Sequence, residues 1–303
     1  AAVAKPSGAP LPVPAGATLA WTGMYRVELP YGKRASIAAI DPRGTRIWFV
    51  DQNRTLNAMT PDGYKVFPIA QLPGGANIDA LVVGYEYVYA LDRAGVQLYQ
   101  VSLATELLTW QSVGLLRDGI GFSVTPNDVL WFGRNDQLIS YDPRTKRIAV
   151  VGTGASAITA VTTDSAARVW FAGGRDVVGA YDTRTARLTE YVLPRRGAAT
   201  ALAVDGRGSL WVATDGGELF SLSDGVLQLS ARAAAGTTFS VSRGGTAWTL
   251  RNGPAGGLYA PVDGSRTVDV VPGSVGALIF DQSGRAWLLD RTSGVFYATV
   301  AAP

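Results

Sequence analysis

The stretch that decides the fold is Arg168-Val-Trp-Phe-Ala-Gly-Gly-Arg-Asp-Val-Val-Gly-Ala-Tyr-Asp-Thr-Arg-Thr-Ala-Arg-Leu-Thr-Glu-Tyr-Val-Leu-Pro194. An apolar strand carries Trp170, a second strand ends at Tyr181, and a third runs from Leu188 to Leu193. Gly, Asp and Thr separate these runs, and such residues favour tight turns. The stretch therefore predicts three short strands of an antiparallel sheet.

Similar stretches recur along the whole chain, and an aromatic residue marks the same place in each. These residues are 37 to 42 positions apart: Trp48, Tyr89, Trp131, Trp170, Trp211, Trp248 and Trp287. A period of about 40 residues with four strands is typical of a propeller blade. We therefore expect an all-β, seven-bladed β-propeller of four-stranded antiparallel blades. Because the aromatic position repeats, we interpret it as core between sheets rather than as a ligand-stacking site.

The repeat also predicts where each blade begins and ends. The last repeat supplies only three strands, and the segment Tyr25–Leu29 resembles an outer strand, so we expect the N-terminal strand to close the last blade. Closure removes the sheet edges that would otherwise pair with other chains. The predicted blades 1 to 7 are Ser36–Leu72, Asn77–Val113, Gly119–Val151, Ser156–Leu193, Ala199–Ser230, Thr237–Val271, and Ser274–Val300 with Tyr25–Leu29.

Composition divides the chain into a Pro/Ala-rich leader or tether, residues 1–20, and a single domain, residues 21–303. The leader resembles the start left after removal of a signal peptide, so we expect an exported protein of the periplasm or cell surface. An anchor before Ala1 and an ordinary unstructured start are the alternatives. Lys and Arg are scattered rather than clustered, which does not suggest nucleic acid. No apolar run approaches the roughly 18 residues of a membrane span.

Three fragments resemble the repeats of the streptogramin lyase (virginiamycin B lyase) family: Val169-Trp-Phe171, Leu210-Trp-Val-Ala213 and Leu188-Thr-Glu-Tyr-Val-Leu-Pro194. The resemblance extends from Tyr25 to Val300, is shared with NHL-like propellers, and implies the propeller fold. The lyase family uses a catalytic His and a divalent metal held partly by Glu. This chain contains no His, so the resemblance does not imply lyase activity. The consensus Glu three residues after the Trp is also replaced, by Asp51, Asp92, Arg134, Gly173, Thr214, Arg251 and Asp290.

The residue types that are absent exclude several kinds of chemistry. Without His or Cys there is no Ser-His-Asp triad, no Cys nucleophile, and no zinc site with His or Cys ligands. Carboxylate-oxygen sites for Ca²⁺ or Mg²⁺ remain open. Blades 7, 1 and 2 become neighbours on closure, so Asp290, Asp51 and Asp92 would share one sector, where they could hold such a cation. We name no catalytic residue and expect no other cofactor.

The loops that join second and third strands, with the loops that enter each blade, should form one common face. They carry Asp and Arg in most blades, which predicts a partner-binding face. The alternative is ordinary turn chemistry, with Asp and Arg pairing locally for a fraction of a kcal/mol. The candidate residues of this face are Asp51, Arg54, Asp92, Arg93, Arg134, Asp136, Arg175, Arg251, Asp290, Arg291, Arg34 and Arg196.

These observations favour a non-catalytic binding scaffold of the bacterial cell envelope, which engages a protein or surface polymer through that face. A carboxylate–metal-dependent lyase or hydrolase, with its site at the central mouth, is one alternative. A structural subunit of a larger cell-surface assembly, docked through blade 2 or the leader, is another.

Overall fold

The structure is a computed structural model. It describes residues 2–3, 5–7, 24–62, 64–174, 176–194, 197–232, 238–253, 256–261, 269–271 and 275–299. The chain forms two compact units, one of residues 1–114 with 246–303 and one of residues 115–245. The described elements are strands, apart from two short 3₁₀ turns at Pro30–Gly32 and Gly114–Asp118. No helix in this part of the chain is long and apolar enough to cross a membrane.

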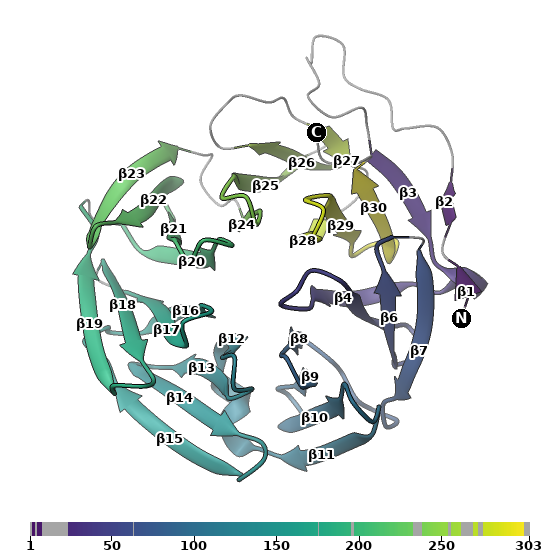
Figure 1. Ribbon diagram of the computed structural model, residues 1–303, viewed down its shortest axis with the longest axis horizontal. Coiled ribbons are helices and arrows are strands. Elements are labelled where there is room, and N and C mark those ends of the chain that lie inside the picture. The colour runs from purple at the N-terminus through teal and green to yellow at the C-terminus, as the bar shows by residue number, and fades with distance from the viewer. Residues whose placement is uncertain are drawn as a thin grey trace. The chain divides into compact units, whose positions relative to one another are not determined.

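The first unit contains three antiparallel sheets that correspond to predicted blades 1, 2 and 7. Each has the four strands of a blade, and the sheets of blades 1 and 7 carry a fifth strand at the outer edge. Their inner strands β28, β4 and β8 lie side by side (Figure 1). The strands are β4 (Ala35–Ile40), β5 (Ile47–Asp51), β6 (Thr55–Thr60) and β7 (Lys65–Gln71); β8 (Ala80–Val83), β9 (Tyr87–Asp92), β10 (Gln97–Ser102) and β11 (Leu108–Ser112); and β28 (Val275–Phe280), β29 (Ala286–Asp290), β30 (Val295–Thr299) and β3 (Met24–Glu28).

The second unit contains the three complete sheets of predicted blades 3, 4 and 5. Each is antiparallel, and its strands follow one another in chain order. They are β12 (Ile120–Val124), β13 (Leu130–Arg134), β14 (Gln137–Asp142) and β15 (Arg147–Gly152); β16 (Ile158–Thr163), β17 (Arg168–Gly173), β18 (Val177–Asp182) and β19 (Arg187–Val192); and β20 (Ala199–Val204), β21 (Leu210–Thr214), β22 (Glu218–Ser223) and β23 (Val226–Arg232).

The prediction of four-stranded antiparallel blades is confirmed, but the described residues show six complete blades rather than seven. The difference falls on predicted blade 6, Thr237–Val271. Strands β25 (Ala247–Gly253), β26 (Gly256–Pro261) and β27 (Asp269–Val271) pair in the first unit, whereas β24 (Thr238–Val241) belongs to the second. The connections of this segment include residues 233–237, 254–255 and 262–268, which lie outside the described residues.

The N-terminal strand closes the last blade, as the sequence predicts. Strand β3 pairs antiparallel with β30, with Met24 opposite Thr299 and Val27 opposite Phe296. Val27 and Phe296 are both fully buried in the core that the last blade shares with blade 1. The two ends of the repeat region are therefore joined by backbone pairing as well as by apolar contact.

Within the predicted leader or tether, the residues that the structure describes, 2–3 and 5–7, are paired as strands. Strand β1 (Ala2–Val3) lies antiparallel to β7, with Ala2 opposite Val66. Strand β2 (Lys5–Ser7) lies antiparallel to β3, with Lys5 opposite Glu28. These short strands cover the outer edges of two neighbouring sheets, where unpaired backbone groups would otherwise face solvent.

The repeating aromatic residue is core in most blades. Trp48, Tyr89, Trp131, Trp170, Trp248 and Trp287 are buried, and Trp211 is half-buried. Trp287, for example, packs with Phe49 and Met59 of the next blade. The interpretation as packing between sheets is therefore confirmed at six positions and holds in part at Trp211.

In three blades an aspartate binds both the turn before the aromatic residue and the indole. The indole contact is longest in blade 5, at 3.5 Å from Trp211 Nε1 to Asp205 Oδ2, and it is shorter in blades 4 and 7. The Asp164 Oδ1 atom accepts the backbone N–H of Arg168 at 2.9 Å, while Oδ2 accepts Arg168 Nε at 2.6 Å and Trp170 Nε1 at 3.0 Å. Asp281 does the same with Arg285 and Trp287, at 3.0 Å for each of the three contacts. One carboxylate thus satisfies the turn, the arginine and the buried indole.

We expect Trp287→Ala to lower the free energy of unfolding by about 3–5 kcal/mol, because it leaves a cavity between two sheets. The exposed Trp110 provides the matched control, and Trp110→Ala should change stability by less than about 0.5 kcal/mol. Urea unfolding followed by the fluorescence of the remaining tryptophans measures both. Equal effects of the two substitutions would contradict the assignment of Trp287 to the core.

Candidate functional site

The three aspartates that were predicted to share one sector each stand at the end of a strand, and the three strands belong to neighbouring sheets. Asp51 is the last residue of β5, Asp92 of β9 and Asp290 of β29. The inner strands of these three sheets are adjacent within the first unit (Figure 1). The repeat therefore predicts the positions of these three residues along the chain. What the residues can bind depends on the direction of their side chains.

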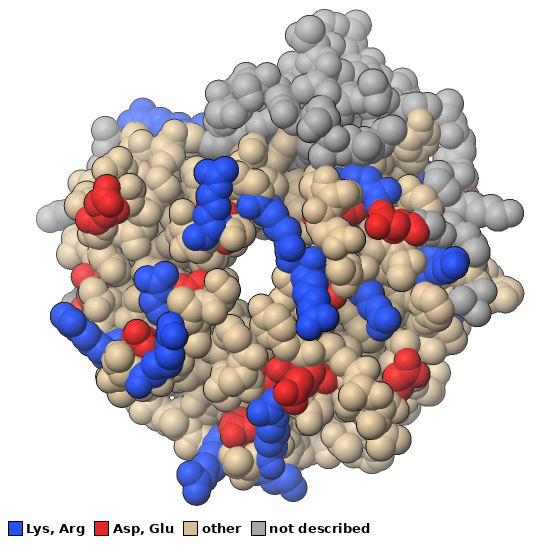
Figure 2. All heavy atoms as spheres, in the orientation of Figure 1, with Lys and Arg blue, Asp and Glu red and all other residues tan. Residues whose placement is uncertain are grey.

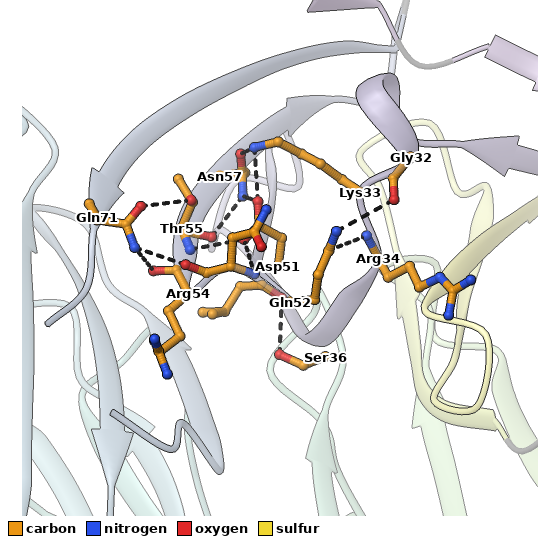
Figure 3. A network of polar contacts seen from close by, with 12 residues as sticks. Gly32, Lys33, Arg34, Ser36, Asp51, Gln52, Arg54, Thr55, Asn57 and Gln71 are labelled. Carbon is orange, nitrogen blue, oxygen red and sulfur yellow. Dashed lines mark hydrogen bonds and ion pairs between the residues drawn. The ribbon is translucent and has the colours of Figure 1, made fainter. Parts of the chain in front are cut away.

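The Asp51 carboxylate faces inward, into a network with Lys33 and Asn57 (Figure 3). Its Oδ2 atom lies 2.8 Å from Lys33 Nζ and accepts Asn57 Nδ2 at 3.1 Å. Its Oδ1 atom accepts the backbone N–H groups of Asn53 and Thr55, each at 2.9 Å. Lys33 Nζ also donates to Asn57 Oδ1 at 2.7 Å, so the half-buried Lys33 and the buried Asp51 and Asn57 all contact one another.

This network stabilises the ionised form of Asp51. Burial raises the pKa of the carboxyl, but hydrogen bonds from Lys33, Thr55 and Asn57, together with the charge of Lys33, outweigh burial and hold the pKa below its ordinary 3.8. The carboxylate is only 2% exposed and is occupied on both oxygens. It serves the structure of blade 1 and is not presented to a ligand.

Asp92 and Asp290 are likewise buried and bound to their own loops. Asp92 accepts the backbone N–H of Gly95 at 2.7 Å and that of Asn77 at 3.1 Å. Asp290 accepts the backbone N–H of Thr292 at 2.9 Å and the hydroxyl of Ser293 at 2.6 Å. Each carboxylate thus satisfies the donors of a turn, a common role of Asp at strand ends.

The two charged carboxylates also affect buried phenols on the next strand. Burial raises the pKa of Tyr99, and the negative charge of Asp92 raises it further. Burial and then Asp290 raise the pKa of Tyr297, while Arg26 opposes them. Both phenols therefore remain neutral hydrogen-bonding groups at neutral pH.

The three aspartates do not form a common cation site. Each is used by its own turn, and among the described residues no group of three or more His, Cys, Asp or Glu side chains could hold a metal ion. The carboxylates of the predicted acidic sector are therefore buried instead of facing solvent. The physical reason is that a buried carboxylate needs several donors, and each nearby turn supplies them.

The exposed charges of the same sector include three arginines. Arg34, Arg54 and Arg291 are exposed, and within the described chain no carboxylate pairs with their guanidinium groups. Figure 3 shows Arg34 and Arg54 directing these groups away from the Asp51 network. Figure 2 shows basic side chains gathered near the inner strands β28 and β4 on the face in view.

Backbone contacts bring the loops of these arginines together. Gln52 donates its backbone N–H to Arg34 O at 3.0 Å, and Arg34 donates its own to Gln52 Oε1 at 2.5 Å. Ala35 donates to Gly294 O at 2.8 Å, which joins the start of β4 to the β29–β30 turn. The stem of Arg291 lies over Gly276 of β28, where any larger residue would collide with it. We call Arg34, Arg54 and Arg291 the arginine face.

Two of the other predicted arginines are already paired with carboxylates. Arg93 is paired with Asp79 at 2.9 Å, and Arg134 with Asp118 at 3.3 Å. Asp136, in the second unit, is exposed, and its backbone carbonyl accepts Thr153 Oγ1 at 2.7 Å. Arg175, Arg196 and the side chain of Arg251 lie outside the described residues, so the predictions for them stay predictions.

Sequence reasoning did not anticipate the partnership of Lys33 and Asn57 with Asp51. Asn57 is fully buried in β6, whose neighbours Leu56, Ala58 and Met59 are apolar. A single amide on such a strand is a signal that a polar partner lies nearby, because buried polar groups need hydrogen bonds. Lys33 carried no such signal, since it precedes a strand in a loop.

No protein-family model matches the chain, and no curated protein matches it. Its fold is similar to a solved streptogramin B lyase, with a TM-score of 0.72, 14% identity, and coverage of 94% of this chain and 100% of that one. It is also similar to a virginiamycin B lyase from Staphylococcus aureus, solved with quinupristin, which is catalytically inactive through a His-to-Ala substitution; the TM-score is 0.68, the identity 15%, and the coverage 91% and 98%.

A further similar structure is the extracellular domain of a putative hybrid two-component system from B. thetaiotaomicron. Its TM-score is 0.63 and its identity 15%, and the match covers 92% of this chain and 40% of that one. Identities this low show the fold alone. The chain therefore has the all-β propeller fold, which proteins of different function share.

Replacing Lys33 by Met should lower the free energy of unfolding by about 3 kcal/mol at neutral pH, because Asp51 then stays buried without its counter-ion. The depressed pKa of Asp51 means that its contribution is present above about pH 3.8 and is lost as the pH falls through the folded-state value. The gap between wild type and variant should therefore narrow in acid. Urea titrations across this range measure it.

Lys65 is the control, because it is exposed on β7 and lies in the same unit. Lys65→Met should alter stability by less than about 0.5 kcal/mol at any of these pH values. The double variant Lys33→Met with Asp51→Asn should recover part of the loss. A constant Lys33→Met effect between neutral pH and acid would argue against the ion pair.

Proposed function

We propose that this protein is a non-catalytic binding scaffold of the bacterial cell envelope, which engages an anionic protein or surface polymer through the arginine face. The observation that supports this most directly is the charge exposed where Asp51, Asp92 and Asp290 were expected to form an acidic surface. These three carboxylates are buried. The arginines Arg34, Arg54 and Arg291 are exposed there, without carboxylate partners in the described chain.

The chemistry of arginine suits such a role. A guanidinium presents a planar fork of donors that matches a carboxylate or phosphate. Cations that are not paired within their own chain attract an anionic partner without first breaking an internal ion pair, and they speed its approach. The loops that carry them are fastened by backbone hydrogen bonds, so little order has to be created on binding.

We further propose that the propeller has seven blades and works outside the cytoplasm. In support of the count, Trp248 occupies the repeating aromatic position and strands β25–β27 pair antiparallel, as three strands of a blade would. In support of the location, a solved extracellular domain has a similar fold. The carboxylate–metal-dependent lyase or hydrolase draws no support from the described carboxylates.

A structural subunit that docks through blade 2 is the second candidate. The outer part of that blade exposes large apolar side chains, with Leu107 at 66% and Trp110 at 59% exposed. Trp110 stands on β11, an edge strand of its sheet. Exposed aromatic residues on an edge are typical of contact surfaces.

Replacing Arg34, Arg54 and Arg291 together by Glu should weaken binding to a fluorescent poly-glutamate, used as an anionic probe, by at least about tenfold, or about 1.4 kcal/mol. Binding of the wild-type protein should fall as salt rises, because exposed charges are screened. Fluorescence anisotropy at several salt concentrations measures both.

The matched control replaces Lys65, Arg147 and Arg187 by Glu. These exposed cations begin the outer strands β7, β15 and β19, and the net charge changes by the same amount. The control should bind within about twofold of wild type. If both triple variants lose affinity equally, net charge rather than the arginine face is responsible, and our proposal fails.

A further inference from the structure

Blade 1 departs from its sister blades at the turn before its tryptophan. In blades 4 and 7 the Arg two residues before the Trp and the Trp itself share the Oδ2 atom of an aspartate six residues before the Trp. Blade 1 keeps the arginine, Arg46, and the indole, Trp48. Its turn is one residue longer, so its aspartate, Asp41, stands seven residues before Trp48.

The longer turn uses the Asp41 carboxylate completely. Oδ1 accepts the backbone N–H groups of Thr45 at 2.6 Å and Arg46 at 3.1 Å. Oδ2 accepts the Thr45 hydroxyl at 2.6 Å. The oxygen that serves the arginine and the indole in the sister blades is therefore bound to a threonine here.

The consequence is an incomplete site. Trp48 is 2% exposed, and its indole nitrogen has no hydrogen-bond acceptor within the described chain. The Arg46 guanidinium, on the exposed surface, is not paired with a carboxylate among the described residues. A buried donor without an acceptor is uncommon in proteins and calls for an explanation.

A cavity of about 270 Å³ adjoins these groups. The β4–β5 turn and Trp48 form its wall on blade 1, and Tyr85 and Leu103 belong to its wall on blade 2. The charged residues of the wall are Asp41, Arg43 and Arg46. All of these residues belong to the first unit. The cavity lies at the end of β4 and β5 opposite to the arginine face, because the β4–β5 turn lies at one end of these strands and Arg34 and Arg54 at the other.

We propose that this cavity binds a small organic carboxylate. One oxygen of the ligand takes the place of the missing aspartate Oδ2, between the Trp48 indole N–H and the Arg46 guanidinium. The apolar body of the ligand lies against Tyr85 and Leu103, and Arg43 adds a second positive charge at the rim. Because the indole nitrogen is buried, the flexible arginine side chains rearrange as the ligand enters.

The sister blades identify the class of ligand. The Asp164 and Asp281 carboxylates show which group fits between an indole and a guanidinium at this position of the fold. Two arginines outnumber Asp41, the one acid in the wall, whose oxygens are already bound to its own turn, so the cavity disfavours a cation. The size of the cavity favours a small molecule over a polymer. The indole of Trp131 also lacks an acceptor, because Thr125 occupies the position of the aspartate in the sister blades. Two residues before Trp131, however, the chain has Val129 and not an arginine.

The test uses benzoate as the probe and benzamide as its neutral match, with the indole N–H signals followed by ¹H–¹⁵N NMR on the whole protein. Saturable movement of the Trp48 signal with benzoate, and none with benzamide, is the expected result. The Trp170 and Trp287 signals should stay in place, since their indoles are already bound to aspartate. Trp131 reports on adventitious binding to an indole that lacks an acceptor.

Two variants test the geometry. Arg46→Gln should weaken benzoate binding at least about tenfold while the protein stays folded, because Arg46 is exposed. Lys65→Gln, on the outer strand β7 of the same sheet, should leave benzoate binding unchanged. No saturable shift of Trp48, an equal response to benzamide, an equal response of Trp131, or full affinity in Arg46→Gln would each overturn the proposal.

Discussion

An aspartate that binds the N–H groups of its own turn is the interaction on which much of this structure depends. It recurs at both ends of the second strands. Before the aromatic residue, Asp164 and Asp281 hold the turn and the buried indole together. After it, Asp51 and Asp290 hold the loop into the third strand. These hydrogen bonds fix the turn, so the aromatic residue lies in the interface between sheets and no buried N–H donor of these turns is left without an acceptor.

The same constraint determines which charges remain for binding. The carboxylates of Asp51, Asp92 and Asp290 satisfy their loops and are buried, so they are not available to a ligand at the surface of the sector. Arginines have no comparable role in these turns, because the main-chain groups that need partners there are donors. The arginine face of the first unit is therefore a consequence of how its turns are built, and its charge has the opposite sign to that of an acidic sector.

Much of the fold could be predicted from the sequence, because the same pattern of strands, turns and an aromatic residue recurs about every 40 residues. The spacing of the aromatic residues located the blades, and Tyr25–Leu29 could be recognised as the missing outer strand. The direction of Asp51 could not be predicted, because spacing gives the position of a residue but not whether its side chain turns inward. The strands at Ala2–Val3 and Lys5–Ser7 were missed as well, since pairing with an edge depends on the partner strand and not on a local pattern.

Within a repeat protein, what recurs is best explained by folding, and departures from the repeat are the places to look for function. Blade 1 contains two departures. Lys33 and Asn57 hold Asp51 at one end of its sheet, and the longer turn separates Asp41 from Trp48 at the other. Neither helps the blade to fold better than its sisters: one buries a charge, and the other leaves an indole without an acceptor. Departures of this kind are expected at functional sites, and the indole that the longer turn leaves without an acceptor is the reason we propose a ligand site in blade 1.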